Sequence, residues 1–173
     1  MTTARTTDAY QLRYSWEIEG PIDTVFHYVS DARTFLEWFT VFREVRPNDP
    51  TGSLRVGSHV RCRVKAFLPY TLDWDITVAV HEPPTFMRTD CRVSLSGRFG
   101  MHGYVQYRFE KRGPLVIVLN EQEMVADRPL PRLLHPLGQA IFSFNHDWAM
   151  GRARGPLQAI VTRAIAQTRA MGG

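Results

Sequence analysis

The sequence lacks the residues and patterns on which several large protein classes depend. Its 173 residues include only two cysteines, Cys62 and Cys91, which form no CxxC pair. Disulfide scaffolds and most structural zinc sites need more cysteines at closer spacing. No apolar run approaches the ~20 residues of a membrane-spanning helix, and the first eight residues include no apolar segment typical of a signal peptide. We therefore expect reduced thiols, no transmembrane segment and a cytoplasmic location.

Motifs that mark common active sites are absent as well. The sequence contains neither GxSxG nor HExxH, which place a serine nucleophile and two zinc ligands respectively. We therefore expect no metal and no cofactor, and we expect any chemistry to proceed without a covalent nucleophile. The 12 glycines, 11 prolines and 44% hydrophobic residues are ordinary for a globular protein and exclude collagen and low-complexity disorder.

The net charge of +4 is concentrated after Ala126, in a segment that contains six arginines and two aspartates. Such a segment suits phosphate binding or a solvated helix face, and we favour the helix face. A second basic stripe lies on one predicted strand, at His59, Arg61, Arg63 and Lys65. Asp73 and Asp75 on the next strand are placed to pair with it across the sheet. Because the aromatic residues point to the opposite face, we expect no nucleic-acid partner.

Alternation of apolar and polar residues with period two predicts a sheet. The clearest run covers residues 10–19, where Tyr10, Trp16 and Ile18 share one face. Two short helices are predicted next, over residues 22–30 and 31–37, with Asp31 as the cap of the second. Further strands are predicted at hairpin spacing over residues 60–65, 71–80, 87–95, 99–109 and 115–125.

The last third of the chain changes to a helical period. A stripe at helical spacing is formed by Leu133, Leu137, Ile141, Phe144 and Trp148, and Gly151 and Gly155 continue it. Pro156 is expected to kink or break this helix. Because the stripe needs a partner surface, we expect the sheet to wrap around the helix with the stripe facing inward. His146 lies opposite the stripe, so we expect it to face solvent.

The final strand has two faces of different chemistry. If its even-numbered face points inward, Asn120 and Gln122 offer neutral hydrogen bonds to a carbonyl or hydroxyl group. If its odd-numbered face points inward, Glu121 and Glu123 are buried carboxylates suited to proton transfer. Burial of two unpaired carboxylates is costly, so we favour the even-numbered face.

Together these elements resemble the helix-grip fold of the START/SRPBCC superfamily, which includes polyketide cyclases and lipid-transfer domains. The stretches that carry the resemblance are residues 10–26, 29–31 with Trp38 after them, Gly57 before a strand, 81–84 between strands, and 129–134 before the long helix. The resemblance implies an α+β domain over residues 10–170, with residues 1–9 as a flexible N-terminus. It also implies six to seven strands curved around the C-terminal helix and an interior pocket for a hydrophobic molecule.

The aromatase/cyclase branch of this superfamily holds a poly-β-ketone with polar pocket residues. The resemblance places Val80 and Val78 where that branch has Arg and Ser, and Phe42 where it has Tyr. Gln122 matches the Gln of that branch. Because three of the four polar positions are apolar here, we expect a drier pocket.

We therefore predict that the protein binds a polyketide-like, polycyclic or lipid-like molecule. It is either an enzyme with cyclase/dehydrase activity or a non-catalytic carrier of a lipid or quinone. For chemistry, the candidate residues are Gln122, Asn120 and, as a proton donor, Tyr107. The candidate ligand-binding residues are Trp16, Trp38, Phe42, Trp74, Met87, Phe99, Phe144, Trp148 and Gly151. The aromatic residues also suit a packed core, and Gly151 suits either close helix packing or space for a ligand. We place the pocket mouth at residues 67–70, 97–100 and 127–129, and a homodimer is left open.

Overall fold

The alternating segments form one antiparallel sheet. The computed structural model describes residues 9–95, 99–127 and 135–171. Within them, the sheet has seven strands in the order β1-β7-β6-β5-β4-β3-β2. The strands are β1 (Ala9–Glu19), β2 (Phe42–Pro47), β3 (His59–Val64), β4 (Leu72–Glu82), β5 (Phe86–Leu95), β6 (Phe99–Arg112) and β7 (Leu115–Ala126). The helical elements are α1 (Ile22–Ser30), the 3-10 turn η1 (Ala32–Thr34), α2 (Phe35–Trp38) and α4 (His135–Met171).

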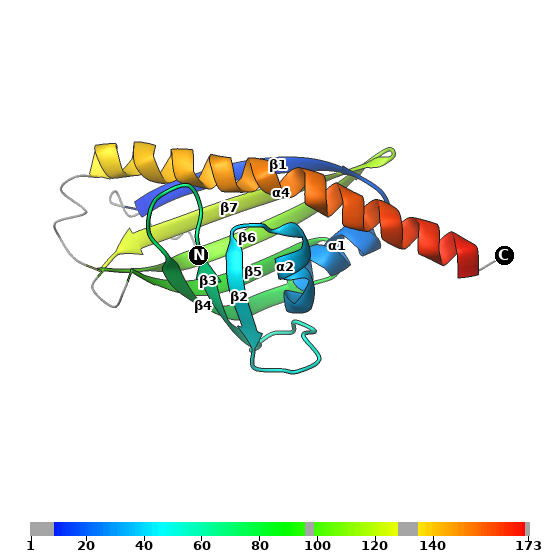
Figure 1. Cartoon of the computed structure of the whole chain (residues 1–173), viewed down its shortest axis with the longest axis horizontal. Helices are drawn as coiled ribbons and strands as arrows, with labels where there is room; N and C mark the ends of the chain where they lie inside the picture. Colours follow the sequence, from blue (N-terminus) through cyan, green and yellow to red (C-terminus); the bar gives the residue numbers. More distant parts are fainter. Residues whose placement is uncertain (1–8, 96–98, 128–134, 172–173) are drawn as a thin grey trace, which may run out of the picture.

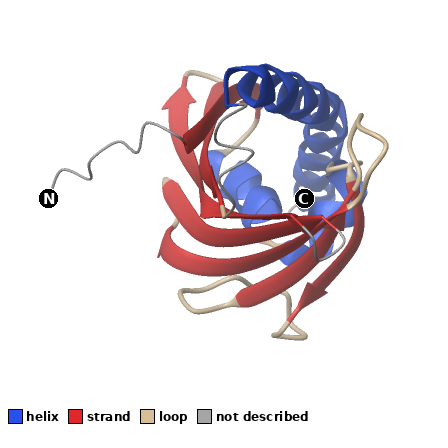
Figure 2. Cartoon of the chain, turned by 90° about the vertical axis from the view of Figure 1, so that its left-hand side faces the viewer, coloured by secondary structure: helices blue, strands red, loops and turns tan. Residues whose placement is uncertain are grey.

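The sheet curls around the long helix α4, as the sequence predicted. Figure 1 shows α4 lying along β1, with the short helices between the sheet and the C-terminal half of α4. In the end-on view of Figure 2 the strands surround most of the interior and α4 closes the remaining side. Strands β1 and β2 lie at opposite edges of the sheet, so the segment containing α1, η1 and α2 crosses from one edge to the other. The predicted α+β class and helix-grip order are therefore confirmed.

Close approach between two strands helps the sheet to curve. Gly103 of β6 pairs with Met124 of β7, and a Cβ atom at position 103 would lie 1.8 Å from the carbonyl oxygen of Glu123. No side chain fits at that separation, so glycine permits the two backbones to approach.

The strand β2 is missing from the sequence prediction. Its residues Phe42–Pro47 form an edge strand that pairs with β3. A register shift between Phe42 and Glu44 interrupts the alternation, because a bulge adds one residue to one strand of a pair. The period-two pattern is therefore broken in the segment where it would have revealed the strand.

The helix α4 turns the opposite face inward from the one predicted. The predicted stripe lies on the exposed side at Leu137, Ile141, Phe144, Gly151 and Gly155. The side that faces the interior carries Phe142, His146, Ala149, Met150, Ala153 and Leu157. The predicted inward stripe is therefore wrong, and Leu133, its first member, lies outside the described residues. Apolar residues occupy both sides of this helix, so the helical period alone does not select the buried one.

Of the two outcomes expected at Pro156, a kink or a break, the break does not occur, since α4 is one helix that continues to Met171. The proline ring clashes mainly with the Cβ atom of the preceding residue and with the carbonyl group one turn earlier. The preceding residue is Gly155, which has no Cβ atom. Ala153 and Leu157 are both fully buried, and they hold the helix on the sheet on either side of the proline. Figure 1 shows that the helix axis changes direction along its length.

The packed core lies under the middle of α4. Trp16 of β1 is fully buried, and its indole Nε1–H donates a hydrogen bond of 2.8 Å to the carbonyl oxygen of Met150. Its ring meets that of Trp38 edge-on, with centroids 5.9 Å apart. These contacts connect β1, α2 and α4, so they fix the distance between the sheet and the helix.

Candidate functional site: an interior cavity

A cavity of about 390 Å³ lies between the concave face of the sheet and the N-terminal half of α4. Its walls come from β1, α2, the inner faces of β3 to β7, the segment between β3 and β4, and α4. Folded cores seldom contain voids much larger than a water molecule, so a space of this size needs a reason other than imperfect packing. The volume falls in the range of small-molecule sites, roughly 300–1,000 Å³.

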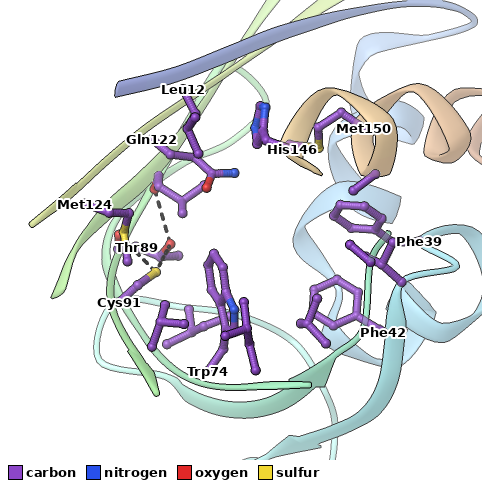
Figure 3. A pocket seen from close by; sticks show the side chains of 18 of the residues that line it. Leu12, Phe39, Phe42, Trp74, Thr89, Cys91, Gln122, Met124, His146 and Met150 are labelled. Atoms are coloured by element: carbon purple, nitrogen blue, oxygen red, sulfur yellow. Dashed lines mark hydrogen bonds between the residues drawn. The ribbon is translucent and has the colours of Figure 1, made fainter. Parts of the chain in front are cut away.

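Most of the cavity wall is apolar, because the inward positions of consecutive strands carry apolar side chains. Trp74 of β4 and Met87 of β5 line it from the sheet. Aromatic side chains from the segment around α2 line another part of the wall, at Phe35, Trp38, Phe39 and Phe42. In Figure 3 the labelled Phe39 and Phe42 lie together on one side of the cavity, and Trp74 lies at its bottom. Flat rings on two sides suit a ligand with rings of its own.

Polar groups gather at the end of the cavity opposite Trp74 (Figure 3). Gln122 of β7 and His146 of α4 line it there. Behind them lies Asn120, whose amide group is 3.1 Å from the Gln122 amide and 3.1 Å from His146 Nε2. His146 Nδ1 lies 3.2 Å from Asp147 Oδ1. Hydrogen bonds therefore connect the cavity to the protein surface.

Burial changes the protonation behaviour of two cavity residues. Burial lowers the pKa of His146, although the carboxylate of Asp147 opposes this effect. Burial raises the pKa of Tyr107, and the neighbouring Asn120 amide offsets part of the rise. At neutral pH the imidazole is therefore neutral and the phenol keeps its proton. The polar end of the cavity can donate and accept hydrogen bonds without carrying a charge.

Six of the predicted site residues line this cavity: Gln122, Tyr107, Trp38, Phe42, Trp74 and Met87. Asn120 lies directly behind Gln122 rather than in the wall. Trp16 belongs to the packed core. Phe144 is 56% exposed and packs with Trp148 around Phe67 on the outer side of α4.

Gly151 also faces outward, where a Cβ atom would lie 3.3 Å from the Tyr14 hydroxyl. Gly151 is not among the cavity wall residues, and the short distance to Tyr14 means that α4 packs closely against β1 at this position. The side chain of Phe99 lies outside the described residues. At the predicted mouth, Leu68 and Tyr70 line the cavity, whereas residues 97, 98, 128 and 129 lie outside the described residues.

The prediction that His146 faces solvent is wrong, because this residue is only 8% exposed and lines the cavity. Its predicted outward position followed from the wrong face of α4. Asn145 and Thr89 are further polar wall residues that the sequence prediction did not include. Asn145 accepts a hydrogen bond of 3.3 Å from the backbone N–H of Leu68, which ties the segment between β3 and β4 to α4. The polar run Asn145-His146-Asp147, between Phe144 and Trp148, was the available signal.

The even-numbered face of β7 points inward, which confirms the prediction for this strand. Val116, Val118, Asn120 and Met124 are buried. Glu121 lies on the outer face, where it pairs with Arg13 at 3.1 Å and accepts a hydrogen bond from Gln106. The basic stripe of β3 is likewise paired across the outer face, with Arg61 3.1 Å from Asp75 and Arg63 3.1 Å from Asp73.

The positions assigned by resemblance to the aromatase/cyclase branch are only partly in the wall. Phe42 and Gln122 line the cavity, whereas Val78 and Val80 are not among its wall residues. Among the described residues, no three His, Cys, Asp or Glu side chains are grouped as a metal site requires. In the same part of the chain, no helix combines the length and apolar character needed to span a membrane.

Comparison with known proteins identifies the fold and no closer relationship. No protein-family model and no curated protein sequence matches the chain. The Zhui aromatase/cyclase from Streptomyces sp. R1128 superposes with a TM-score of 0.71 at 10% identity, covering 91% of this chain and 96% of that one. A conserved protein from Geobacillus kaustophilus gives a TM-score of 0.69 at 9% identity, with 88% and 95% covered.

A third similar structure is DynU16, a protein of the dynemicin biosynthetic locus. It gives a TM-score of 0.52 at 18% identity, and the match covers 88% of this chain and 47% of that one. At these identities the matches establish architecture and not activity. The chain therefore has the helix-grip fold found in the START/SRPBCC superfamily.

Proposed function

We propose that the protein binds one hydrophobic small molecule per chain in the cavity between the sheet and α4. The single observation that carries this proposal is the cavity of about 390 Å³, whose wall is mostly apolar, with Gln122 and His146 at one end. An apolar molecule gains roughly 25 cal/mol for each Å² of apolar surface removed from water. The aromatic wall formed by α2 and β4 favours a polycyclic or polyketide-like ligand over a flexible lipid chain.

Binding without chemistry is the form of this function that the polar groups favour. Gln122 has no titratable proton, and the raised pKa of Tyr107 keeps its hydroxyl protonated. These groups hold a carbonyl oxygen by hydrogen bonds, as a carrier of a polycyclic, quinone or lipid-like molecule requires. A carrier needs no group that takes a proton from its ligand.

Cyclase/dehydrase activity is the second candidate. Its support is the fold shared with the Zhui aromatase/cyclase together with Gln122 and Tyr107 at one end of the cavity. In this reading the cavity folds a poly-β-ketone and the two side chains hydrogen-bond its carbonyl oxygens. Incubation with a linear aryl triketone distinguishes the candidates, because cyclisation with dehydration yields a product lighter by one water. Activity that disappears in Gln122→Leu and Tyr107→Phe supports the enzyme, and an unchanged triketone supports the carrier.

Tryptophan fluorescence tests binding itself. Trp74 lines the cavity, whereas Trp148 packs on the outer side of α4. Titration with oleic acid and with anilinonaphthalene sulfonate should quench tryptophan emission at one ligand per chain. The quenching should shrink in Trp74→Phe and persist in the matched variant Trp148→Phe. Unchanged emission with both ligands, and a native mass spectrum showing no bound molecule, would contradict the proposal.

A further inference from the structure

A chain of hydrogen bonds runs from the surface to the cavity through Asp147, His146, Asn120 and Gln122. The three contacts measure 3.2, 3.1 and 3.1 Å. The outer end is accessible, since the side chain of Asp147 is 58% exposed. The middle is not, because Asn120 is 1% exposed. The inner end, Gln122, lines the cavity.

The carboxylate at the outer end fixes the direction in which these hydrogen bonds point. An ionised Asp147 only accepts hydrogen bonds, so Nδ1 of His146 carries the hydrogen that faces it. The buried imidazole is neutral at neutral pH, and its Nε2 therefore has a lone pair in place of a hydrogen. A lone pair requires a donor, and Asn120 is the group 3.1 Å away. Asn120 must therefore turn its amide nitrogen toward His146.

The burial of the Asn120 amide is a second reason for its nitrogen to point toward His146. The oxygen and nitrogen of a carboxamide have nearly the same shape, so hydrogen bonding decides which atom points where. With the oxygen toward His146, the Asn120 nitrogen is buried near the Tyr107 hydroxyl but makes no hydrogen bond at normal distance, at a cost of about 1–3 kcal/mol. With the nitrogen toward His146, its two hydrogens serve His146 and Gln122. The oxygen then lies on the side of Tyr107, the residue paired with Asn120 across the sheet.

Gln122 completes the chain at the cavity. Because Asn120 donates, Gln122 accepts with Oε1 and turns its NH2 group toward the cavity. We propose that Asp147, His146 and Asn120 are positioning residues that hold Gln122 as a hydrogen-bond donor, so that the cavity selects apolar ligands carrying a ketone or quinone carbonyl over ligands that carry only a donor. This inference rests on the proposed binding function and names its ligand class.

Protonation of His146 reverses the direction of these hydrogen bonds. Both ring nitrogens of an imidazolium donate, so Asn120 must then accept with its oxygen, and Gln122 donates to Asn120 and turns its own oxygen to the cavity. The titratable groups that face His146 are Asp147 on α4 and Tyr14 on β1. The ring centroids of Tyr14 and His146 are 6.3 Å apart. Tyr107 on β6 lies behind Asn120. Affinity for a carbonyl ligand therefore falls as the pH drops through the pKa of His146, which lies below 6.5.

Three tricyclic probes of nearly identical shape test the selectivity. Fluorenone carries an acceptor, carbazole carries a donor and fluorene carries neither. Equilibrium dialysis at pH 7.5 should give fluorenone an affinity ~10-fold above that of fluorene, the value of one good hydrogen bond. Carbazole should bind no more tightly than fluorene. Equal affinity for fluorenone and carbazole, or a preference for carbazole, overturns the inference.

Substitutions test whether the hydrogen-bonded residues from Asp147 to Gln122 cause this selectivity. Gln122→Leu should abolish the preference for fluorenone while fluorene binds as before. Asp147→Asn allows the outer end to donate as well as accept, so the ratio of fluorenone to carbazole affinity should fall several-fold. The matched control is Asp23→Asn, which removes a charge from an exposed position on α1 and should leave the ratio unchanged. An unchanged ratio in Asp147→Asn refutes the positioning role of the carboxylate.

Nuclear magnetic resonance of 15N-labelled histidine tests the direction of the hydrogen bonds without any ligand. The inference requires the Nδ1–H tautomer of neutral His146, and the Nε2–H tautomer overturns it. This measurement separates the two ideas. If none of the probes binds, the proposed function fails for this ligand class, whereas the tautomer still decides the direction of the hydrogen bonds.

Discussion

Filling the cavity from α4 should stabilise the protein while weakening ligand binding. Ala149 is 8% exposed and lines the cavity, so Ala149→Leu adds three carbon atoms to a space that is already open. At roughly 0.8 kcal/mol for each buried CH2 group, the added carbons contribute about 2 kcal/mol. The ordering of the leucine side chain offsets roughly 0.5–1 kcal/mol of this. We expect a net gain of about 1 kcal/mol in the free energy of unfolding, measured by urea denaturation, and a clear loss of fluorenone affinity.

Ala153, one turn further along α4, provides the matched control. It is fully buried in the packed core and is not among the cavity wall residues. Ala153→Leu places the same three atoms where no space exists, which should cost roughly 1–3 kcal/mol of stability. Opposite signs for the two substitutions support an open cavity beneath Ala149. A destabilisation of Ala149→Leu equal to that of Ala153→Leu would refute the reasoning.

Other predictions concern the elements that frame the cavity. Burial tends to raise the pKa of Asp31, but hydrogen bonds and charge attraction from Arg33 outweigh it and hold the pKa below 3.8; the resulting stability is present above pH 3.8 and lost as the pH falls through the lowered pKa. Urea titrations of wild type and Asp31→Asn should therefore differ at pH 6 and converge in acid, and a constant difference would contradict this. Burial raises the pKa values of both cysteine thiols to about 12, so iodoacetamide at pH 8 should label them only after unfolding, and rapid native labelling would show that they are accessible. Gly138→Ala should destabilise the protein in thermal melts despite its better helix propensity, because the new Cβ atom lies 2.8 Å from the Tyr10 hydroxyl; a higher melting temperature would exclude this clash.

Most of the sheet could be predicted because its inward positions are mainly apolar and its outward positions are mainly polar. The inward face of β7 also followed from energetics, since the alternative would have buried Glu121 and Glu123 without partners. The strand β2 could not be predicted in this way, because the bulge between Phe42 and Glu44 breaks the alternation. The hydrogen bonds of the polar end were also beyond the sequence, since they join residues on β7 and α4 whose side chains meet only after the sheet has curled.

The reversed face of α4 has a physical cause that concerns the cavity itself. A helix that packs against a core carries its largest apolar residues on the buried side. A helix that lines a cavity must leave space, and beside Phe142 and Met150 its inward positions here include the small or polar residues Asn145, His146 and Ala149. Large apolar residues such as Phe144 then remain on the outer side, where Phe67 covers part of the surface. The hydrophobic pattern therefore points outward where the cavity lies and inward again at Leu157 and Val161, where α4 packs against the core. Within one helix, this change of the apolar face marks where the packed core gives way to the cavity.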